Sequence, residues 1–155
     1  MMRALTLLTL LLLSGPAYPQ EAHPGLAVWK AFGCPDCHGA LGQGGASVEF
    51  PKGPNLRRGY QDRAFLTEMV SCGRPGTPMP AFLDVAYTQR MCAGWLRPNE
   101  PVPPEVNRLG VFTAAEVAAV VQYVLDRIQG MGEISPSECA AFYGDARHAD
   151  CAPRR

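Results

Sequence analysis

The stretch "FGCPDCHGALGQGG", Phe32 to Gly45, carries the residues on which the fold of this chain depends. Cys34 and Cys37 are separated by two residues, and His38 follows at once. Cys-x-x-Cys pairs occur in zinc sites, in thiol redox centres and in sites of covalent haem attachment. The remainder of the chain has to decide between these three uses.

Length and composition limit the class of protein. A chain of 155 residues is long enough for one ordinary domain. Its formal net charge is zero at pH 7, so nothing predicts a basic surface for nucleic acid. The 16 glycines and 15 prolines indicate a loop-rich fold with limited regular structure.

The first 20 residues, "MMRALTLLTLLLLSGPAYPQ", predict a secretory signal peptide. Arg3 supplies the positive charge, and residues 4–13 form a short leucine-rich core. A bilayer span takes about 20 apolar residues, so this core is too short for a stable membrane helix. We expect cleavage between residues 17 and 22 and export of the mature chain; an uncleaved membrane anchor is the less favoured alternative.

Cysteines outside the CxxC pair predict disulfides. In an oxidising compartment unclaimed thiols tend to pair, and the even total of six fits complete use. The four others are Cys72, Cys92, Cys139 and Cys151. Four cysteines allow three pairings, of which we favour Cys72–Cys92 and Cys139–Cys151, closing loops of 19 and 11 intervening residues.

Apolar periodicity predicts helices and no strands. A helical stripe over 26–32 runs directly into the CxxCH, and a second helix extends from Asp62 as N-cap to Gly73. The longest helix begins with the T-x-x-E capping box at 113–116 and ends at Gly130, and a short helix begins at Ser135. Residues 83–111 are predicted to be mostly irregular. The chain is therefore predicted to be all-α.

The CxxCH decides between the three uses. Zinc usually takes four ligands from two knuckles, and only one CxxC is present. A thioredoxin-like dithiol follows a strand in a βαβ unit, which the pattern does not show. A plain Cys34–Cys37 disulfide leaves the adjacent His38 unexplained. Two thiols that add to the two vinyl groups of haem, followed by an imidazole for the iron, account for all three residues and suit an exported chain.

Residues 26–129 resemble a class I mono-haem c-type cytochrome, through four pieces in the same order. They are an aromatic-bearing helix leading into "CPDCHG", "KGPNL" at 52–56, "GTPMPAF" at 76–82, and a C-terminal helix containing "VVQYV". The resemblance implies an all-α fold of helices around one covalent haem. It also implies a cytochrome domain over 21–130. The extension over 131–155, which is predicted to contain the short helix, lies outside the resemblance.

The resemblance also implies the site. Cys34 and Cys37 hold the haem, His38 and Met79 are the axial iron ligands, and the Pro54 carbonyl accepts a hydrogen bond from the ligand histidine. Met79 lies in an extended Pro-Met-Pro setting, whereas Met69 is expected in the core. No catalytic residue is predicted.

The implied function is a periplasmic one-electron carrier that shuttles electrons between a dehydrogenase and a terminal acceptor, such as an oxidase or another cytochrome. The alternative is a haem enzyme or gas sensor with an open iron position, or a dedicated cytochrome subunit of an oxidoreductase. Redox proteins are the expected partners.

Other polar residues are given ordinary roles. His23 and His148 have no ligand partners at suitable spacing, so we expect them to be solvated or locally bonded. The three arginines at 57, 58 and 63 are expected to form a solvated rim.

Overall fold

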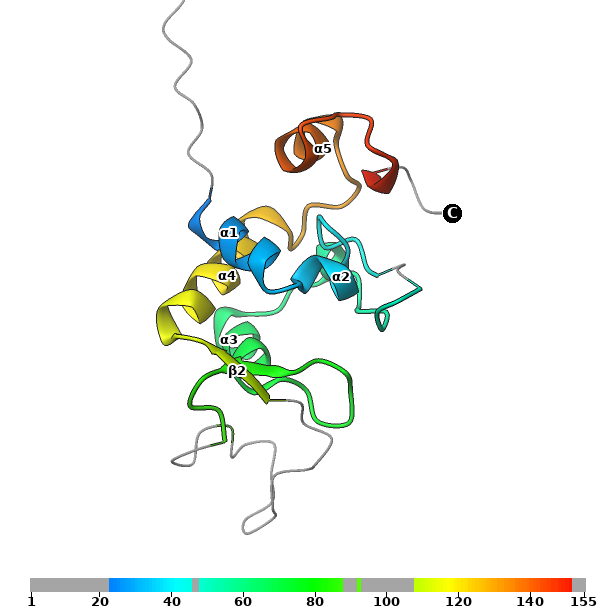
Figure 1. The fold of residues 1–155 in the computed structure, drawn as a ribbon. Coiled ribbons are helices and arrows are strands. Elements are labelled where there is room, and N and C mark those ends of the chain that lie inside the picture. Colours follow the sequence, from blue (N-terminus) through cyan, green and yellow to red (C-terminus); the bar gives the residue numbers. More distant parts are fainter. Residues whose placement is uncertain (1–22, 46–47, 88–91, 93–107, 152–155) are drawn as a thin grey trace, which may run out of the picture.

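The computed structural model describes residues 23–45, 48–87, 92 and 108–151 (Figure 1). The predicted signal peptide lies outside the described residues. The described chain is helix-rich with one small sheet. In chain order the elements are α1 (Pro24–Ala31), α2 (Cys34–His38), η1 (Leu56–Arg58), α3 (Arg63–Cys72), β1 (Ala81–Leu83), β2 (Arg108–Phe112), α4 (Ala114–Arg127), α5 (Pro136–Tyr143) and η3 (Ala149–Cys151).

Helices α1 and α4 cross in close contact beside the core (Figure 1). A Cβ atom at Gly25 of α1 would lie 2.0 Å from the Ala119 carbonyl oxygen and 2.6 Å from the Tyr123 Cβ. The missing side chain of Gly25 thus permits the close approach of the two backbones. The N-cap of the same helix is His23, whose Nδ1 accepts a hydrogen bond from the Gly25 amide at 3.2 Å.

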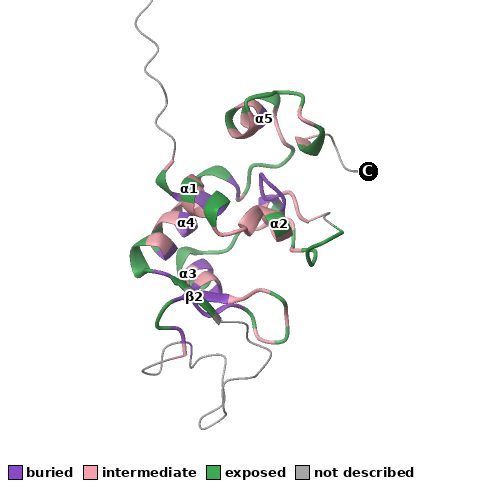
Figure 2. Ribbon diagram, viewed as in Figure 1, coloured by how far each residue is buried: buried purple, intermediate pink, exposed green. Residues whose placement is uncertain are grey.

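Helix α4 forms the centre of the core. Thr113 and Glu116 make both bonds of the predicted capping box, which is confirmed. The buried face of α4, seen in Figure 2, contains Val117, Val120, Val121, Tyr123 and Val124. The helix ends at Arg127, earlier than the predicted end at Gly130, because the Ile128 and Gln129 amides both bond to the Val124 carbonyl and widen the last turn.

Helix α3 begins and ends where the sequence predicts. The Asp62 carboxylate accepts a hydrogen bond from the Phe65 amide at 2.8 Å, and Gly73 turns the chain away with φ +66°. Met69 is buried on the inner face beside Leu66, which confirms its expected place in the core.

The prediction of an all-α chain is wrong at two short strands. β1 and β2 pair in parallel, with Leu83 opposite Phe112. β1 has only three residues, all buried, so it shows no alternation of apolar and polar positions. β2 occupies the end of a segment predicted to be irregular, and its partner strand is distant in the sequence. Short strands of this kind are not visible to a periodicity argument.

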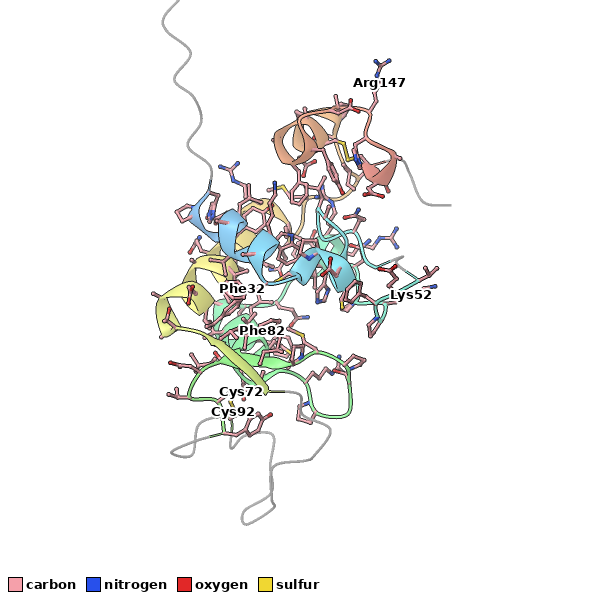
Figure 3. All side chains as sticks on the ribbon, in the orientation of Figure 1. Phe32, Lys52, Cys72, Phe82, Cys92 and Arg147 are labelled. Atoms are coloured by element: carbon pink, nitrogen blue, oxygen red, sulfur yellow. A yellow bond between two sulfur atoms is a disulfide. The ribbon has the colours of Figure 1, made fainter. Side chains whose placement is uncertain are left out.

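A cluster of three phenylalanines joins the end of α1 to this sheet. The rings of Phe32 and Phe112 meet edge-to-face at 4.3 Å between centroids, and those of Phe82 and Phe112 stack at 4.9 Å (Figure 3). Phe112 is fully buried. The residue that precedes the CxxCH turn is therefore fixed by the same core that holds the strand after Pro80.

Both favoured disulfides are confirmed. Cys72 at the end of α3 is bonded to Cys92 (Figure 3), and Cys139 of α5 is bonded to Cys151 of η3. Two such bonds are compatible with an oxidising, exported environment. Within the described residues, no helix has the length and apolarity needed to cross a membrane.

The C-terminal segment, residues 131–151, packs against the N-terminal half of the chain. Its helix α5 begins with the predicted capping box of Ser135 and Glu138. Lys30 of α1 lies 4.0 Å from the centroid of the Phe142 ring and donates a hydrogen bond to the Phe142 carbonyl at 3.0 Å. This segment therefore lies beside α1, and its Asp150 carbonyl accepts a hydrogen bond from Gln43 in the loop after α2 (Figure 1).

Candidate functional site

One short helix, α2, carries both unpaired cysteines and the adjacent histidine. Gly33 precedes it in a left-handed conformation, φ +71°, and lets the chain turn sharply between α1 and α2. Side chains three and four positions apart share one face of a helix. Cys34 therefore presents its thiol on the same face as the side chains of Cys37 and His38.

The two thiols are free and poorly ionised. Cys34 and Cys37 are the free cysteines among the described residues, and the other four cysteines form the two disulfides. Burial raises the pKa of Cys34 to about 12, with a smaller contribution from the Asp36 carboxylate. Burial and Asp36 also raise the pKa of Cys37. A dithiol redox centre needs a lowered thiol pKa, so this environment does not favour that use.

His38 is held by the backbone of a distant loop. Its Nδ1 lies 3.2 Å from the Pro54 carbonyl oxygen. A carbonyl can only accept, so Nδ1 carries the hydrogen and Nε2 keeps a lone pair. Burial lowers the pKa of His38, and the bond to Pro54 opposes this in part. The structure thus favours a neutral imidazole whose Nε2 is able to bind a metal.

Glycines allow that loop to reach His38. The Gly53 amide donates to the Cys37 carbonyl at 2.8 Å. A Cβ atom on Gly53 would lie 2.8 Å from both that oxygen and the His38 Nδ1. A Cβ on Gly45 would lie 2.0 Å from the same Cys37 oxygen. The glycine-rich sequence after CxxCH is therefore required for the backbone to close around the end of α2.

Trp29 of α1 lies near His38 and is bonded to the segment that follows it. Its side chain is buried, and its Nε1 donates a hydrogen bond to the Ala40 carbonyl at 2.9 Å. The indole lies 6.2 Å from the His38 ring and 6.0 Å from the Tyr123 ring, between centroids. One side chain of α1 thus links α4 to the segment that follows His38.

Met79 lies in a different part of the chain, the loop over 73–80 between α3 and β1. Its carbonyl accepts a bond from the Arg74 amide at 3.1 Å, and its amide donates to the Thr77 hydroxyl at 3.3 Å. A Cβ on Gly73 would lie 2.7 Å from the Met79 oxygen, so the loop is tightly closed. In the view of Figure 1 this loop and α2 project on the same side of the core.

The structure thus brings four of the five predicted site residues together: Cys34, Cys37, His38 and Pro54. Met79 is half-buried in its own turn, and its hydrogen bonds join it to that turn rather than to α2. His23 and His148 are locally bonded as expected, because the Nδ1 atoms accept hydrogen bonds from the Gly25 and Asp150 amides respectively. The Nε2 atom of His23 also lies 3.3 Å from the carboxylate of Asp126, which is distant in the sequence.

The sequence predicts Arg57 on a solvated rim, and this prediction is wrong: the residue is buried, with 2% of its surface exposed. All three guanidinium nitrogens donate hydrogen bonds to protein acceptors. Nothing in its local sequence distinguishes it from the exposed Arg58 that follows, because four of its five side-chain hydrogen bonds reach acceptors more than 70 positions away.

Among the described residues, no three His, Cys, Asp or Glu side chains form a cluster able to hold a metal ion, so a four-ligand zinc site is not seen there. Comparison of the chain with protein-family models, with curated proteins and with solved structures gives no match.

Proposed function

We propose that the chain is an exported c-type cytochrome of class I type that carries single electrons. The observation that carries this proposal is the state of α2. Two protonated, unpaired thiols share a helix face with a neutral imidazole whose Nδ1 is already bonded to the Pro54 carbonyl. These groups fit the needs of haem c.

The thiols supply the attachment. Each S–H would add across one vinyl group of the haem, which leaves two thioether bonds and consumes no oxidant. A thiol that stays protonated and unpaired until that addition suits this chemistry better than a thiolate that readily forms a disulfide. Bound in this way, the haem iron supplies a one-electron Fe(III)/Fe(II) couple.

His38 and Pro54 would define one side of the iron. The bond from Nδ1 to the Pro54 carbonyl orients the ring, fixes the tautomer and makes Nε2 a stronger donor. The buried indole of Trp29 lies 6.2 Å from the imidazole, between ring centroids, and would support it from α1. The neutral state of His38 means that no proton has to leave it when it binds iron.

Met79 would supply the second axial ligand. Its thioether is a neutral, soft donor, and a His/Met pair raises the potential of a haem above that of two nitrogen ligands. The closed turn around Arg74 and Thr77 limits movement of the Met79 backbone. If His38 and Met79 both bound the iron, no position would be left for a substrate, which would suit a carrier better than an enzyme.

The cellular setting follows from the same proposal. Covalent haem attachment and two disulfides both belong outside the cytoplasm. We therefore propose a periplasmic protein that exchanges electrons with redox proteins, between a dehydrogenase and a terminal acceptor such as an oxidase or another cytochrome.

The test is to produce the full chain in a host that matures c-type cytochromes and to extract the purified protein with acidified acetone. We expect the colour to remain with the protein, because thioether bonds survive extraction. The spectrum of the reduced pyridine complex should be that of haem with both vinyl groups saturated.

The matched control is the Cys34→Ala/Cys37→Ala double variant, which keeps His38 and both disulfides. Its haem, if any is bound, should pass into the organic layer. A colourless parent, or a parent that loses its haem to acetone, would overturn the proposal. Rapid binding of carbon monoxide to the reduced parent would instead indicate the open-site alternative.

A further inference from the structure

The C-terminal segment is fixed to the body of the protein through a buried arginine. Of the five hydrogen bonds donated by the Arg57 side chain, four reach residues of segment 131–151. The acceptors are the carbonyl oxygens of Gly132 (2.6 Å), Met131 (3.3 Å) and Glu133 (3.1 Å), and the Glu138 carboxylate (2.9 Å). A buried guanidinium requires acceptors of this kind, so the segment completes its environment.

The fifth bond connects Arg57 to the loop that follows the CxxCH. Its Nη1 donates to the Leu41 carbonyl at 3.2 Å. Next to this bond, the Leu56 amide donates to the Gly42 carbonyl at 2.8 Å. These two contacts hold the segment after His38 against the segment that contains Pro54.

A second set of hydrogen bonds joins the loop after the CxxCH to the C-terminal segment. The Gln43 side chain accepts a bond from the Leu41 amide at 2.9 Å and donates to the Asp150 carbonyl at 3.2 Å. Asp150 is adjacent to Cys151, which is bonded to Cys139 of α5. The disulfide therefore joins α5, which carries the Glu138 partner of Arg57, to the residues that contact the loop at Gln43.

We propose that Arg57 is a positioning residue for His38, through which the disulfide-closed C-terminal segment 131–151 keeps the Pro54 carbonyl bonded to the imidazole Nδ1. Arg57 touches neither the imidazole nor the thiols; it acts by holding the loops on the two sides of His38 together. The extension is thus part of the machinery that orients the iron ligand and is not a separate appendage. Its effect on iron ligation rests on the proposed function.

The charges at this contact support the same arrangement. Burial alone would raise the pKa of Glu138, but hydrogen bonds from Ser135 and Arg57 outweigh it, and the pKa is lowered. Glu138 is therefore ionised and paired with Arg57 at neutral pH. Glu138 also closes the capping box of α5, so one carboxylate both starts the helix and binds the arginine.

The experiment measures the His38 Nδ1 proton in the reduced, matured full chain labelled with ¹⁵N. In the parent we expect this proton to exchange slowly with water, because it is bonded to the Pro54 carbonyl. Arg57→Lys keeps the charge but cannot reach five acceptors, and should accelerate exchange at least tenfold. The reduction potential of the haem should also differ between Arg57→Lys and the parent.

Matched controls separate this effect from general destabilisation. Arg58→Lys makes the same change one position later on an exposed side chain and should leave the exchange rate within twofold of the parent. Glu138→Ala should also accelerate exchange, and it serves as the test if Arg57→Lys does not fold. Ser135→Ala removes the cap but keeps the Arg57–Glu138 pair, so its effect should be smaller than that of Glu138→Ala. Equal rates in the parent, Arg57→Lys and Glu138→Ala would overturn the proposal.

A failure of the proposed function is distinguishable. If the purified parent carries no haem, the proposed function is refuted, and the role of Arg57 in joining segment 131–151 to the loops around His38 is tested in the same protein by backbone exchange. The amides of Leu56 and Gly130, which bond to the Gly42 and Arg57 carbonyls, should then exchange at least tenfold faster in Arg57→Lys than in Arg58→Lys. Equal amide exchange rates in Arg57→Lys and Arg58→Lys would refute this role of Arg57.

Discussion

The Nδ1 atom of His38 lies 3.2 Å from the carbonyl oxygen of Pro54, a residue of another loop. This contact is possible because Gly53, immediately before Pro54, has no side chain. Its absent Cβ would stand 2.8 Å from the same Nδ1. The tautomer of the histidine thus depends on a glycine that bears no functional group.

Gly53→Ala is therefore expected to damage the site. The added methyl must displace either the imidazole or the Cys37 carbonyl, and overpacking of this kind costs about 1–3 kcal/mol. We expect that loss in guanidinium unfolding, together with faster exchange of the His38 Nδ1 proton. Gly59→Ala is the control, because its Cβ would meet its nearest neighbour only at 3.2 Å. Equal effects of the two changes would contradict this explanation.

Gly25→Ala tests the crossing of α1 and α4. In an exposed helix the change from glycine to alanine stabilises by about 1 kcal/mol, because alanine has the higher helix propensity. Here the methyl would lie 2.0 Å from the Ala119 carbonyl, so we expect destabilisation by about 1–3 kcal/mol. The comparison is Ala27→Gly, an exposed site in the same helix, which should cost only about 1 kcal/mol. A more stable Gly25→Ala variant would show that the helices are not in close contact.

The fold could be predicted where local chemistry dictates it. Asp62, Thr113 and Ser135 cap helices as their residue types predict, since a cap bonds to amides two or three residues away. The strands could not be predicted, because three residues show no period and the pairing of β1 with β2 is a long-range contact. The end of α4 was misplaced because Gly130 turns the chain only after the last helical bonds have been made.

The lowered pKa of Glu138 predicts how the free energy of unfolding depends on pH. Its pKa in the folded chain lies below its ordinary value of 4.5, because hydrogen bonds from Ser135 and Arg57 outweigh burial. The stability it adds is therefore complete above the unfolded pKa and is lost as the pH falls through the lower folded pKa. We expect Glu138→Gln to be less stable than the parent near neutral pH, with the difference between the two shrinking as the pH falls below the ordinary value of 4.5. Guanidinium unfolding at several pH values measures this, and a constant difference down to pH 3 would contradict it.

The two disulfides are expected to contribute separately to the stability of the chain. In the chain-entropy model, the Cys72–Cys92 and Cys139–Cys151 bonds, with sequence separations of 20 and 12, are each worth about 3 kcal/mol. Replacing Cys72 and Cys92 by alanine should lower global stability by that amount. Replacing Cys139 and Cys151 should in addition expose segment 131–151 to limited proteolysis while α1 and α4 stay protected. Uniform proteolysis of the second variant would show that the segment does not open separately.

The site was predictable to the extent that its chemistry is local. Cys34, Cys37 and His38 lie within five residues, and one helical turn suffices to align them. The contribution of Pro54 came from a resemblance, and the structure shows the contact. Arg57 escaped prediction because burial of a charge depends on acceptors from the far end of the chain.

Met79 and Met69 provide the last prediction, because they separate ligation from packing. Met69 is buried in α3, so Met69→Ala should cost about 2–5 kcal/mol of stability and leave the iron ligands intact. Met79 is only half-buried in its loop, so Met79→Ala should cost less stability but remove the proposed second ligand. The measurement is the near-infrared charge-transfer band of oxidised His/Met haem in the two matured variants. We expect the band in the parent and in Met69→Ala and its loss in Met79→Ala, together with a lower reduction potential. Survival of the band without Met79 would assign the ligand to another residue.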